Sequence, residues 1–230
     1  MVSGILHKNL TEKVYDKIKE EILSGSLKPG ERLVYENLGK EWGISLTPWR
    51  EAIIKLKQEG LVEEVSRGGF YVKLFSLKEI EEMYDIREWL EGLAINLAIH
   101  RINKKEMKTL FQVYNKFEDS IKNKDINSCI MNDFQFHKYL VKFSKNKKLL
   151  AIMETFNIQL VSILRTGPYY LEFVNSYLKE HFSIIEAIKN KNTALAEKLI
   201  RSHIKNGKIL ILKNLKNMNN YNKNANTARK

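Results

Sequence analysis

Hydrophobic residues recur at helical spacing along most of the chain, and the recurrences stop at glycine, proline or asparagine. Near the N-terminus, Val14, Ile18 and Ile22 stand four residues apart. This spacing places them on one face of a helix, which we predict over residues 10–24 and which Gly25 ends. A turn containing Pro29 and Gly30 follows, so the segment up to residue 33 is predicted to be a turn.

Two helices separated by a glycine turn come next. The first is short, over residues 35–42, and Gly43 ends it. The second begins after Ser45, which can act as its N-cap, and runs to Gly60. A short helix, a tight turn and a second helix form the arrangement in which proteins present a helix to the major groove of DNA.

The second of these helices has one buried and one outward face. Trp49, Ile53 and Leu56 recur at helical spacing and predict the buried stripe. Thr47 and Arg50 of the first turn are then left on the outward face. We therefore expect these two residues to contact DNA.

Two short strands follow this helix. Residues 61–65 and 70–74 are rich in β-forming side chains, and the turn between them contains Ser66, Arg67 and two glycines. They predict a hairpin with an exposed Arg67 at its tip. Helices followed by such a hairpin are typical of a winged helix-turn-helix.

Beyond residue 75 the pattern is helical throughout. An example is the apolar stripe formed by Met83, Ile86, Leu90, Leu93 and Leu97. Turn residues divide this part into six predicted helices over residues 76–101, 104–123, 125–143, 146–166, 169–190 and 193–216. The predicted fold is mainly α: an N-terminal winged helix-turn-helix with a small β-hairpin wing, and a C-terminal all-α six-helix bundle.

These boundaries predict two domains and a tail: residues 1–75, residues 76–216, and a polar segment over 217–230 that we expect to be disordered. A chain of 230 residues with 43% hydrophobic residues can supply two cores. The single cysteine, Cys129, excludes an internal disulfide framework, and no apolar run has the length of a membrane span. We expect a cytoplasmic protein with no membrane partner.

Charge alone does not support DNA binding. The net charge is +12, but residues 1–75 carry 12 basic and 11 acidic side chains, a balance of only +1. Five of the excess positive charges lie in residues 213–230. The DNA hypothesis therefore rests on the helix and wing pattern, and a constitutive nucleoid-type DNA binder, which would need a strongly basic head, is disfavoured.

Four residues of the helical part have the spacing of metal ligands. Asp133 and His137 are four residues apart and share one helix face. His181 and His203 each lie eleven residues from Asn192, where an antiparallel helix pair would turn. Both histidines would then sit about 16 Å from the turn, at the same level.

Three imidazoles and one carboxylate suit a divalent metal ion, zinc first, with nickel, manganese or iron as alternatives. The residues themselves leave another interpretation open. They could be surface or core histidines that only form hydrogen bonds.

The first 73 residues resemble a known family. The segments ILSGSLKPGERL, LGKEWGISLTPWREAI and LKQEGLVEEVSRGGFYV, within residues 10–73, are similar to the DNA-binding domain of GntR-family bacterial transcription regulators. The resemblance implies DNA contacts by Arg32, Thr47, Arg50 and Gly68, and we add Ser45 and Arg67 from the pattern. Leu46 stands where the family usually has arginine, so we expect an apolar base contact there.

The helical part has a second resemblance. The segments REWLEGLAINLA, NDFQFHKYLVKFSKNKKLL and EHFSIIEAIKNKNTALAEKLIRSHI, within residues 78–212, resemble the FCD ligand-binding domain of the FadR subfamily, and six helices resemble its VanR-type branch. The resemblance implies that Asp133, His137, His181 and His203 bind a divalent metal. It also implies that Arg87 holds an effector carboxylate, the alternative being a simple pair with Glu91.

Together these features predict a homodimeric transcription regulator, more often a repressor in this family, that binds double-stranded operator DNA. A small organic acid in the metal-containing pocket would set its affinity for the operator. The rival hypothesis is a metal-dependent hydrolase or isomerase with an accessory DNA-binding head. The sequence has no nucleophile elbow, HExxH or paired-carboxylate motif beside the metal ligands that would supply its general base.

Overall fold

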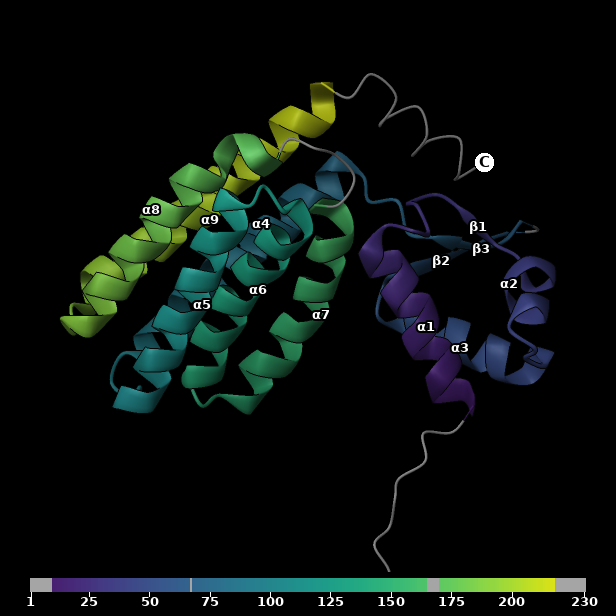
Figure 1. Ribbon diagram of the computed structural model, residues 1–230, viewed down its shortest axis with the longest axis horizontal. Helices are drawn as coiled ribbons and strands as arrows, with labels where there is room; N and C mark the ends of the chain where they lie inside the picture. The colour runs from purple at the N-terminus through teal and green to yellow at the C-terminus, as the bar shows by residue number, and fades with distance from the viewer. Residues whose placement is uncertain (1–9, 67, 165–169, 218–230) are drawn as a thin grey trace, which may run out of the picture. The chain divides into compact units, whose positions relative to one another are not determined.

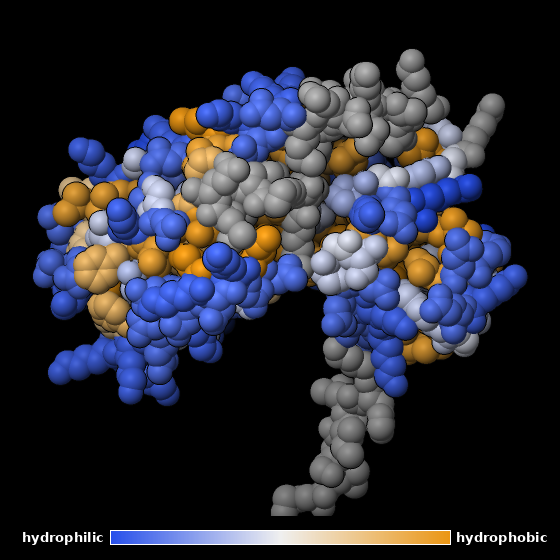
Figure 2. Space-filling model, turned by 45° about the horizontal axis from the view of Figure 1, so that its top comes forward, coloured by the Kyte–Doolittle hydropathy of each residue, from blue (hydrophilic) through white to orange (hydrophobic). Residues whose placement is uncertain are grey.

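The computed structural model describes residues 10–66, 68–164 and 170–217, and these residues form nine helices and three strands (Figure 1). The chain divides into two compact units, one ending at Leu74 and the other beginning at Phe75. Hydrophilic residues cover most of the face drawn in Figure 2, with hydrophobic residues between them. Among the described residues, no helix combines the length and the apolarity needed to cross a bilayer.

The first unit combines three helices with a small sheet. Its elements are α1 Leu10–Ser24, β1 Arg32–Leu33, α2 Tyr35–Glu41, α3 Leu46–Gln58, β2 Val62–Val65 and β3 Gly69–Val72. The strands are antiparallel in the order β1-β3-β2, with Val62 opposite Val72 and Val65 opposite Gly69. The predicted helices and the hairpin wing are confirmed.

Strand β1 is missing from the sequence-based prediction, which has a turn in this segment. Arg32 pairs with Tyr71 and Leu33 with Phe70, so the two residues add a third strand beside β3. A strand of two residues is too short to produce a recognisable alternation of polar and apolar positions. Only the pairing with a distant segment identifies it.

Helices α1 and α3 pack together to form the core of this unit. The buried residues of α1 are Val14, Ile18 and Ile22, as their spacing predicts. The α3 stripe is likewise buried at Trp49, Ile53 and Leu56. Gly43 has a φ of +65°, a left-handed conformation that glycine adopts without steric cost and that lets α3 start close to the end of α2.

The second unit is helical throughout its described part. Its helices are α4 Leu77–Ala98, α5 Lys104–Lys122, α6 Ile126–Phe143, α7 Lys147–Leu164, α8 Tyr170–Lys189 and α9 Thr193–Asn217. Ser76 with Glu79, and Asn103 with Glu106, form capping boxes that satisfy backbone N–H groups at the starts of α4 and α5. All six predicted helices are present.

Helix α6 is central to this bundle because it packs against α4, α5, α7 and α8. Helix α4 also packs along α9, and α8 runs antiparallel beside α9 in Figure 1. The main core cluster draws on α4, α5, α6, α8 and α9, with Ile95, Leu110, Phe136, Ile184 and Ile200 among its members. Side chains on the inward face of α6 therefore meet those of α8 and α9.

The predicted apolar stripe of α4 is wrong in part. Met83 is buried, but Ile86 and Leu93 are 49% and 44% exposed. Arg87 and Glu91 instead face inward, at 3% and 1% exposure. The helix is apolar on more than one side, so periodicity alone does not identify the side that faces the core.

Candidate metal centre and nucleic-acid interface

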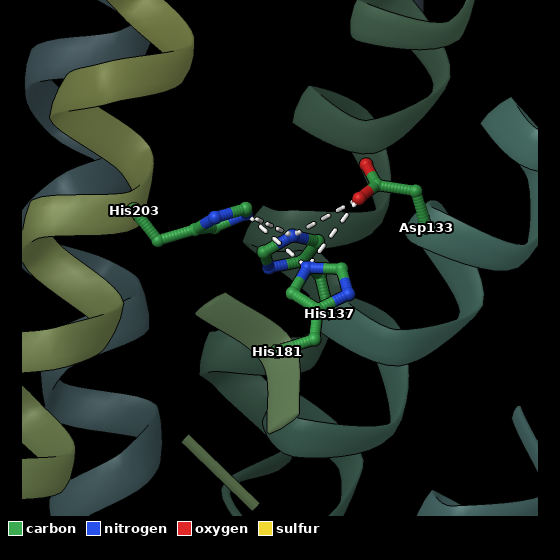
Figure 3. A group of neighbouring side chains, drawn as sticks. All are labelled: Asp133, His137, His181 and His203. Atoms are coloured by element: carbon green, nitrogen blue, oxygen red, sulfur yellow. Dashed lines mark hydrogen bonds and ion pairs between the residues drawn. The ribbon is translucent and has the colours of Figure 1, made fainter. Parts of the chain in front are cut away.

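Three helices of the second unit bring four ionisable side chains together in its core (Figure 3). Asp133 and His137 project from α6, His181 from α8 and His203 from α9. None is more than 5% exposed, and one ligand atom from each lies within 4.8 Å of the others. The fold thus gathers the four residues whose spacing suggested a metal site.

The α8–α9 turn accounts for the alignment of His181 and His203. The turn is closed by a hydrogen bond from Asn192 N–H to the Ala187 carbonyl, with Lys191 at a φ of +56°. The two helices are antiparallel, so residues equally distant from the turn lie at one level. The two Nε2 atoms are 3.3 Å apart.

The distances within the cluster fit a small coordination sphere. His203 Nε2 lies 3.2 Å from His137 Nε2, and Asp133 Oδ1 lies 3.4 Å from His181 Nε2. The distance from Asp133 Oδ1 to His137 Nε2 is longer, at 4.0 Å. Ligands about 2.1 Å from a tetrahedral zinc ion are separated from one another by about 3.4 Å. With the 3.3 Å between the Nε2 atoms of His181 and His203, three of these four separations agree with that value.

Two carboxylates determine which ring nitrogens face the cluster. His137 Nδ1–H donates to Glu91 Oε2, and His203 Nδ1 lies 2.6 Å from Glu180 Oε2. An ionised carboxylate only accepts hydrogen bonds, so each of these histidines carries a proton on Nδ1, and its neutral form presents an Nε2 lone pair to the cluster. The two Nε2 atoms, 3.2 Å apart, are close enough to share either a proton or a metal cation.

The protonation states also suit metal ligation, which requires neutral imidazoles. Burial lowers the pKa of His181 well below its usual value, and the neighbouring His203, His137 and Arg87 lower it further. Burial also lowers the pKa of His137, although Glu91 opposes that shift. Burial by itself would raise the pKa of Glu91, but Arg87 and His137 bring it down to about 2.

A further sign of a metal site is an orphaned oxygen. Asp133 Oδ1 is buried and accepts no hydrogen bond within the described part of the chain, yet it points to the histidine Nε2 atoms. A buried carboxylate oxygen without a donor is costly unless a cation compensates it. Three nitrogens and one oxygen are therefore a suitable donor set for zinc, nickel, manganese or iron.

A cavity of about 20 Å³ adjoins the cluster, and this volume is room for about one water molecule. Asp133 and His203 form part of its wall, together with Arg87, Tyr84 and Tyr177. Burial raises the pKa of Tyr84 to about 12, so its hydroxyl remains protonated. The cavity wall thus combines two candidate metal ligands with a guanidinium and phenol groups.

Arg87 is both paired and incompletely satisfied. Its Nε donates to Glu91 Oε1 at 2.6 Å, so the i, i+4 pair is present. Its Nη2 is buried and has no hydrogen-bond partner among the described residues. The ion pair with Glu91 therefore leaves one N–H group of the guanidinium without a hydrogen bond to the described residues, and Arg87 also lines the cavity.

Sequence reasoning misses the carboxylates that hold the histidine rings. The sequence pattern offers Glu91 only as a partner of Arg87, because its contact with His137 spans 46 residues. Glu180 precedes His181 in the chain but binds His203, on the next helix. Spacing gives no signal for either contact, because both depend on how the helices are rotated against one another.

The outward face of α3 carries the residues expected at DNA. Ser45, Thr47 and Arg50 are exposed, and Leu46 is 41% exposed. Ser45 occupies the N-cap position with an extended backbone, but its side chain forms no capping hydrogen bond. The start of α3 therefore offers a polar and partly apolar surface to a partner.

The wing places Arg32 beside its glycines. Arg32 is exposed, and a Cβ added to Gly69 would lie 3.6 Å from its Nε and Nη2. Gly68 lies in the turn between β2 and β3. Arg67, the other residue predicted at this tip, lies outside the described residues.

Comparison with known families identifies both units. Residues 10–72 match the model of bacterial regulatory proteins of the gntR family, and residues 82–206 match the model of the FCD domain.

Two curated relatives and one solved structure cover most of the chain. It is 34% identical over 194 residues to YdhC, an uncharacterised HTH-type transcriptional regulator of Bacillus subtilis (strain 168), covering 82% of this chain and 85% of that protein. It is 30% identical over 199 residues to the gluconate operon transcriptional repressor of Bacillus licheniformis, covering 83% and 80%. The structure of Escherichia coli McbR/YncC matches with a TM-score of 0.78 at 22% identity, covering 90% and 99%, and so supports the fold.

The four-residue cluster predicts metal-dependent stability. Zn²⁺ at a hundredfold excess over its Kd should stabilise the wild type by about 2.7 kcal/mol, because only the folded chain assembles the ligands. His203→Ala should lose most of this gain, since it removes one of four ligands. Thermal unfolding with and without Zn²⁺ measures the difference.

The matched control is His100→Ala, since His100 is exposed, outside the cluster and 3.4 Å from Thr193 Oγ1. It should keep the full zinc effect. Equal zinc stabilisation of the two variants would contradict the site.

Proposed function

Because the chain belongs to the GntR family of bacterial regulatory proteins and carries an FCD domain, we propose that it is a repressor controlled by a small carboxylate metabolite. The family and the curated relatives are transcription regulators, so the chain is a DNA-binding regulator and not an enzyme. The rival hypothesis of a metal-dependent hydrolase or isomerase is not favoured. We further infer a cytoplasmic member of the FadR subfamily with the six-helix, VanR-like type of FCD domain, since α4–α9 are six helices.

The observation that supports the effector hypothesis most directly is that Arg87, whose Nη2 has no hydrogen-bond partner among the described residues, lines a cavity with Asp133 and His203. A planar guanidinium recognises carboxylates well. A divalent ion held by Asp133, His137, His181 and His203 would supply a positive centre for the same ligand. The cavity as described has room for about one water, so a metabolite requires the bundle to open.

That requirement gives a mechanism for control. A carboxylate that binds the opened bundle better than the closed one shifts the population toward the opened state. The operator affinity can then change by no more than the difference in affinity between the two states. We assign residues 76–216 to sensing and dimerisation and residues 1–75 to DNA binding.

For the DNA-binding unit we propose contacts by Arg32, Ser45, Thr47, Arg50 and Gly68, with Arg67 added from the sequence pattern. The exposed first turn of α3 supports Thr47 and Arg50 as groove contacts. Leu46, with its exposed side chain, can offer apolar contact to a thymine methyl but cannot bond a guanine edge.

A homodimer is proposed because α4 has an exposed apolar face. Ile86, Trp89 and Leu93 recur at helical spacing and are 49%, 62% and 44% exposed. Exposed Glu81 and Glu82 precede this stripe on α4, while Lys198 and Lys205 are exposed on the adjoining α9. Both signs of charge beside one apolar stripe suit a second copy related by a two-fold axis.

Arg50→Ala should weaken binding to a duplex selected from a random library by about 1 to 3 kcal/mol, because it removes a base or phosphate contact. Lys55→Ala is the matched control, an exposed cation about 140° around the same helix. Fluorescence anisotropy on the selected duplex gives both affinities. Failure of the wild type to enrich any duplex would rule out the DNA-binding assignment.

Arg87→Ala should abolish the release of operator by an organic acid that acts on the wild type, while leaving operator affinity intact, because Arg87 lies in the sensing unit. Arg87→Lys retains the charge without the planar fork and should be strongly impaired. Lys208→Ala, which removes a cation paired with Asp85 outside the cavity, should respond normally. A normal response by both Arg87 variants would leave Arg87 as the partner of Glu91 alone.

Trp89→Glu should convert the dimer to a monomer at micromolar concentration, because it places a charge in the centre of the apolar stripe. Ile152→Glu is the control, since Ile152 is 48% exposed on α7 and outside the stripe. Analytical ultracentrifugation distinguishes the species. A Trp89→Glu variant that sediments as a dimer would place the interface elsewhere.

A further inference from the structure

The carboxylate of Glu91 contacts both the candidate metal site and the cavity arginine. It is 1% exposed. Its Oε1 accepts a hydrogen bond from Arg87 Nε at 2.6 Å, and its Oε2 accepts one from His137 Nδ1. The other nitrogen of His137 points into the metal cluster, 3.2 Å from His203 Nε2. Arg87 and His137 are thus joined through a single side chain.

The chemistry of the two contacts requires a carboxylate. Arg87 Nε always carries a hydrogen, and His137 Nδ1 must carry one whenever its Nε2 serves as a ligand. Both partners are then donors, so the residue between them needs two acceptors. A glutamine has one acceptor and one donor, and it can satisfy either Arg87 or the ligating tautomer of His137, but not both.

Glu180 provides a natural comparison. It contacts His203 Nδ1 through Oε2 at 2.6 Å, as Glu91 contacts His137. Its Oε1 accepts a hydrogen bond from Asn206 Nδ2 at 2.9 Å, on the exposed side of the bundle. Glu180 therefore orients one histidine of the candidate site in the same way as Glu91, but its two oxygens contact His203 and Asn206 and not the cavity arginine.

We propose that Glu91 is a positioning residue that couples the metal site to carboxylate binding, an inference that rests on the proposed function. When His137 is a ligand, its Nδ1–H fixes Oε2 of Glu91, and Oε1 then holds Arg87 by Nε. This arrangement leaves Nη2 of Arg87, a residue of the cavity wall, without a hydrogen-bond partner among the described residues and available to a carboxylate. Metal and carboxylate therefore favour each other's binding through one side chain, and the coupling is reciprocal.

The test measures the Zn²⁺ affinity of the full chain by competition with a fluorescent chelator, with and without saturating acetate as the carboxylate probe. The ratio of the two affinities is the coupling. In the wild type we expect acetate to tighten Zn²⁺ binding at least fivefold, within the usual range of coupling between sites. Glu91→Gln and Glu180→Gln should each weaken Zn²⁺ binding by about 10- to 100-fold, because each removes a partner that orients a ligand histidine.

The two variants should differ in the coupling itself. Glu180→Gln should keep the wild-type ratio, whereas Glu91→Gln should lose most of it, because its amide cannot serve both donors. Glu91→Asp keeps two acceptors but is one methylene shorter, so it should also lose the coupling. It provides a second variant if glutamine impairs folding, which circular dichroism monitors.

The possible outcomes separate this proposal from the proposed function. If acetate coordinates the metal and Glu91 has no linking role, the coupling will be equal in wild type, Glu91→Gln and Glu180→Gln. That result would overturn the positioning role alone. A wild type that takes up no Zn²⁺, or whose Zn²⁺ affinity ignores acetate, would overturn both the proposed effector site and the role of Glu91.

Discussion

The buried pairing of Arg87 with Glu91 is the constraint around which the second unit is arranged. Charges removed from water are tolerated only when partners compensate them. Here Arg87 neutralises Glu91, and Glu91 in turn accepts a hydrogen bond from His137. Because these side chains occupy the inward face of α4, Ile86 and Leu93 are turned outward. One buried ion pair thus orients His137 of the candidate metal site and also leaves an apolar stripe on the surface.

The sequence predicts the helices well because each carries a periodic apolar pattern between clear turn signals. It also predicts that His181 and His203 lie side by side, because residues equally distant from the turn of an antiparallel helix pair are at the same position along the two helix axes. The sequence-based prediction fails where the rotation of a helix about its axis decides which side chains face inward. The inward direction of Arg87 and the ring contacts of Glu91 and Glu180 depend on packing between distant segments, which a linear pattern does not contain.

The same limit applies to the first unit. The α3 stripe is predicted because Trp49, Ile53 and Leu56 bury one side of a single helix. Strand β1 is not, because its two residues acquire a strand conformation only by pairing with β3. The proposed DNA-facing surface is therefore predictable as far as one helix defines it. The position of Arg32 beside Gly69 requires the assembled sheet.

The length of the loop between α8 and α9 determines whether His203 reaches the other residues of the candidate metal site. His203 reaches the cluster because α9 starts at a fixed point after the turn closed by Asn192. One residue inserted at the start of α9 would move His203 by about 1.5 Å along the axis and rotate it by about 100°. Surface loops usually tolerate such insertions. In this loop, a change of length that leaves the helices intact would instead remove a nitrogen from the cluster, so the number of residues matters there as much as their identity.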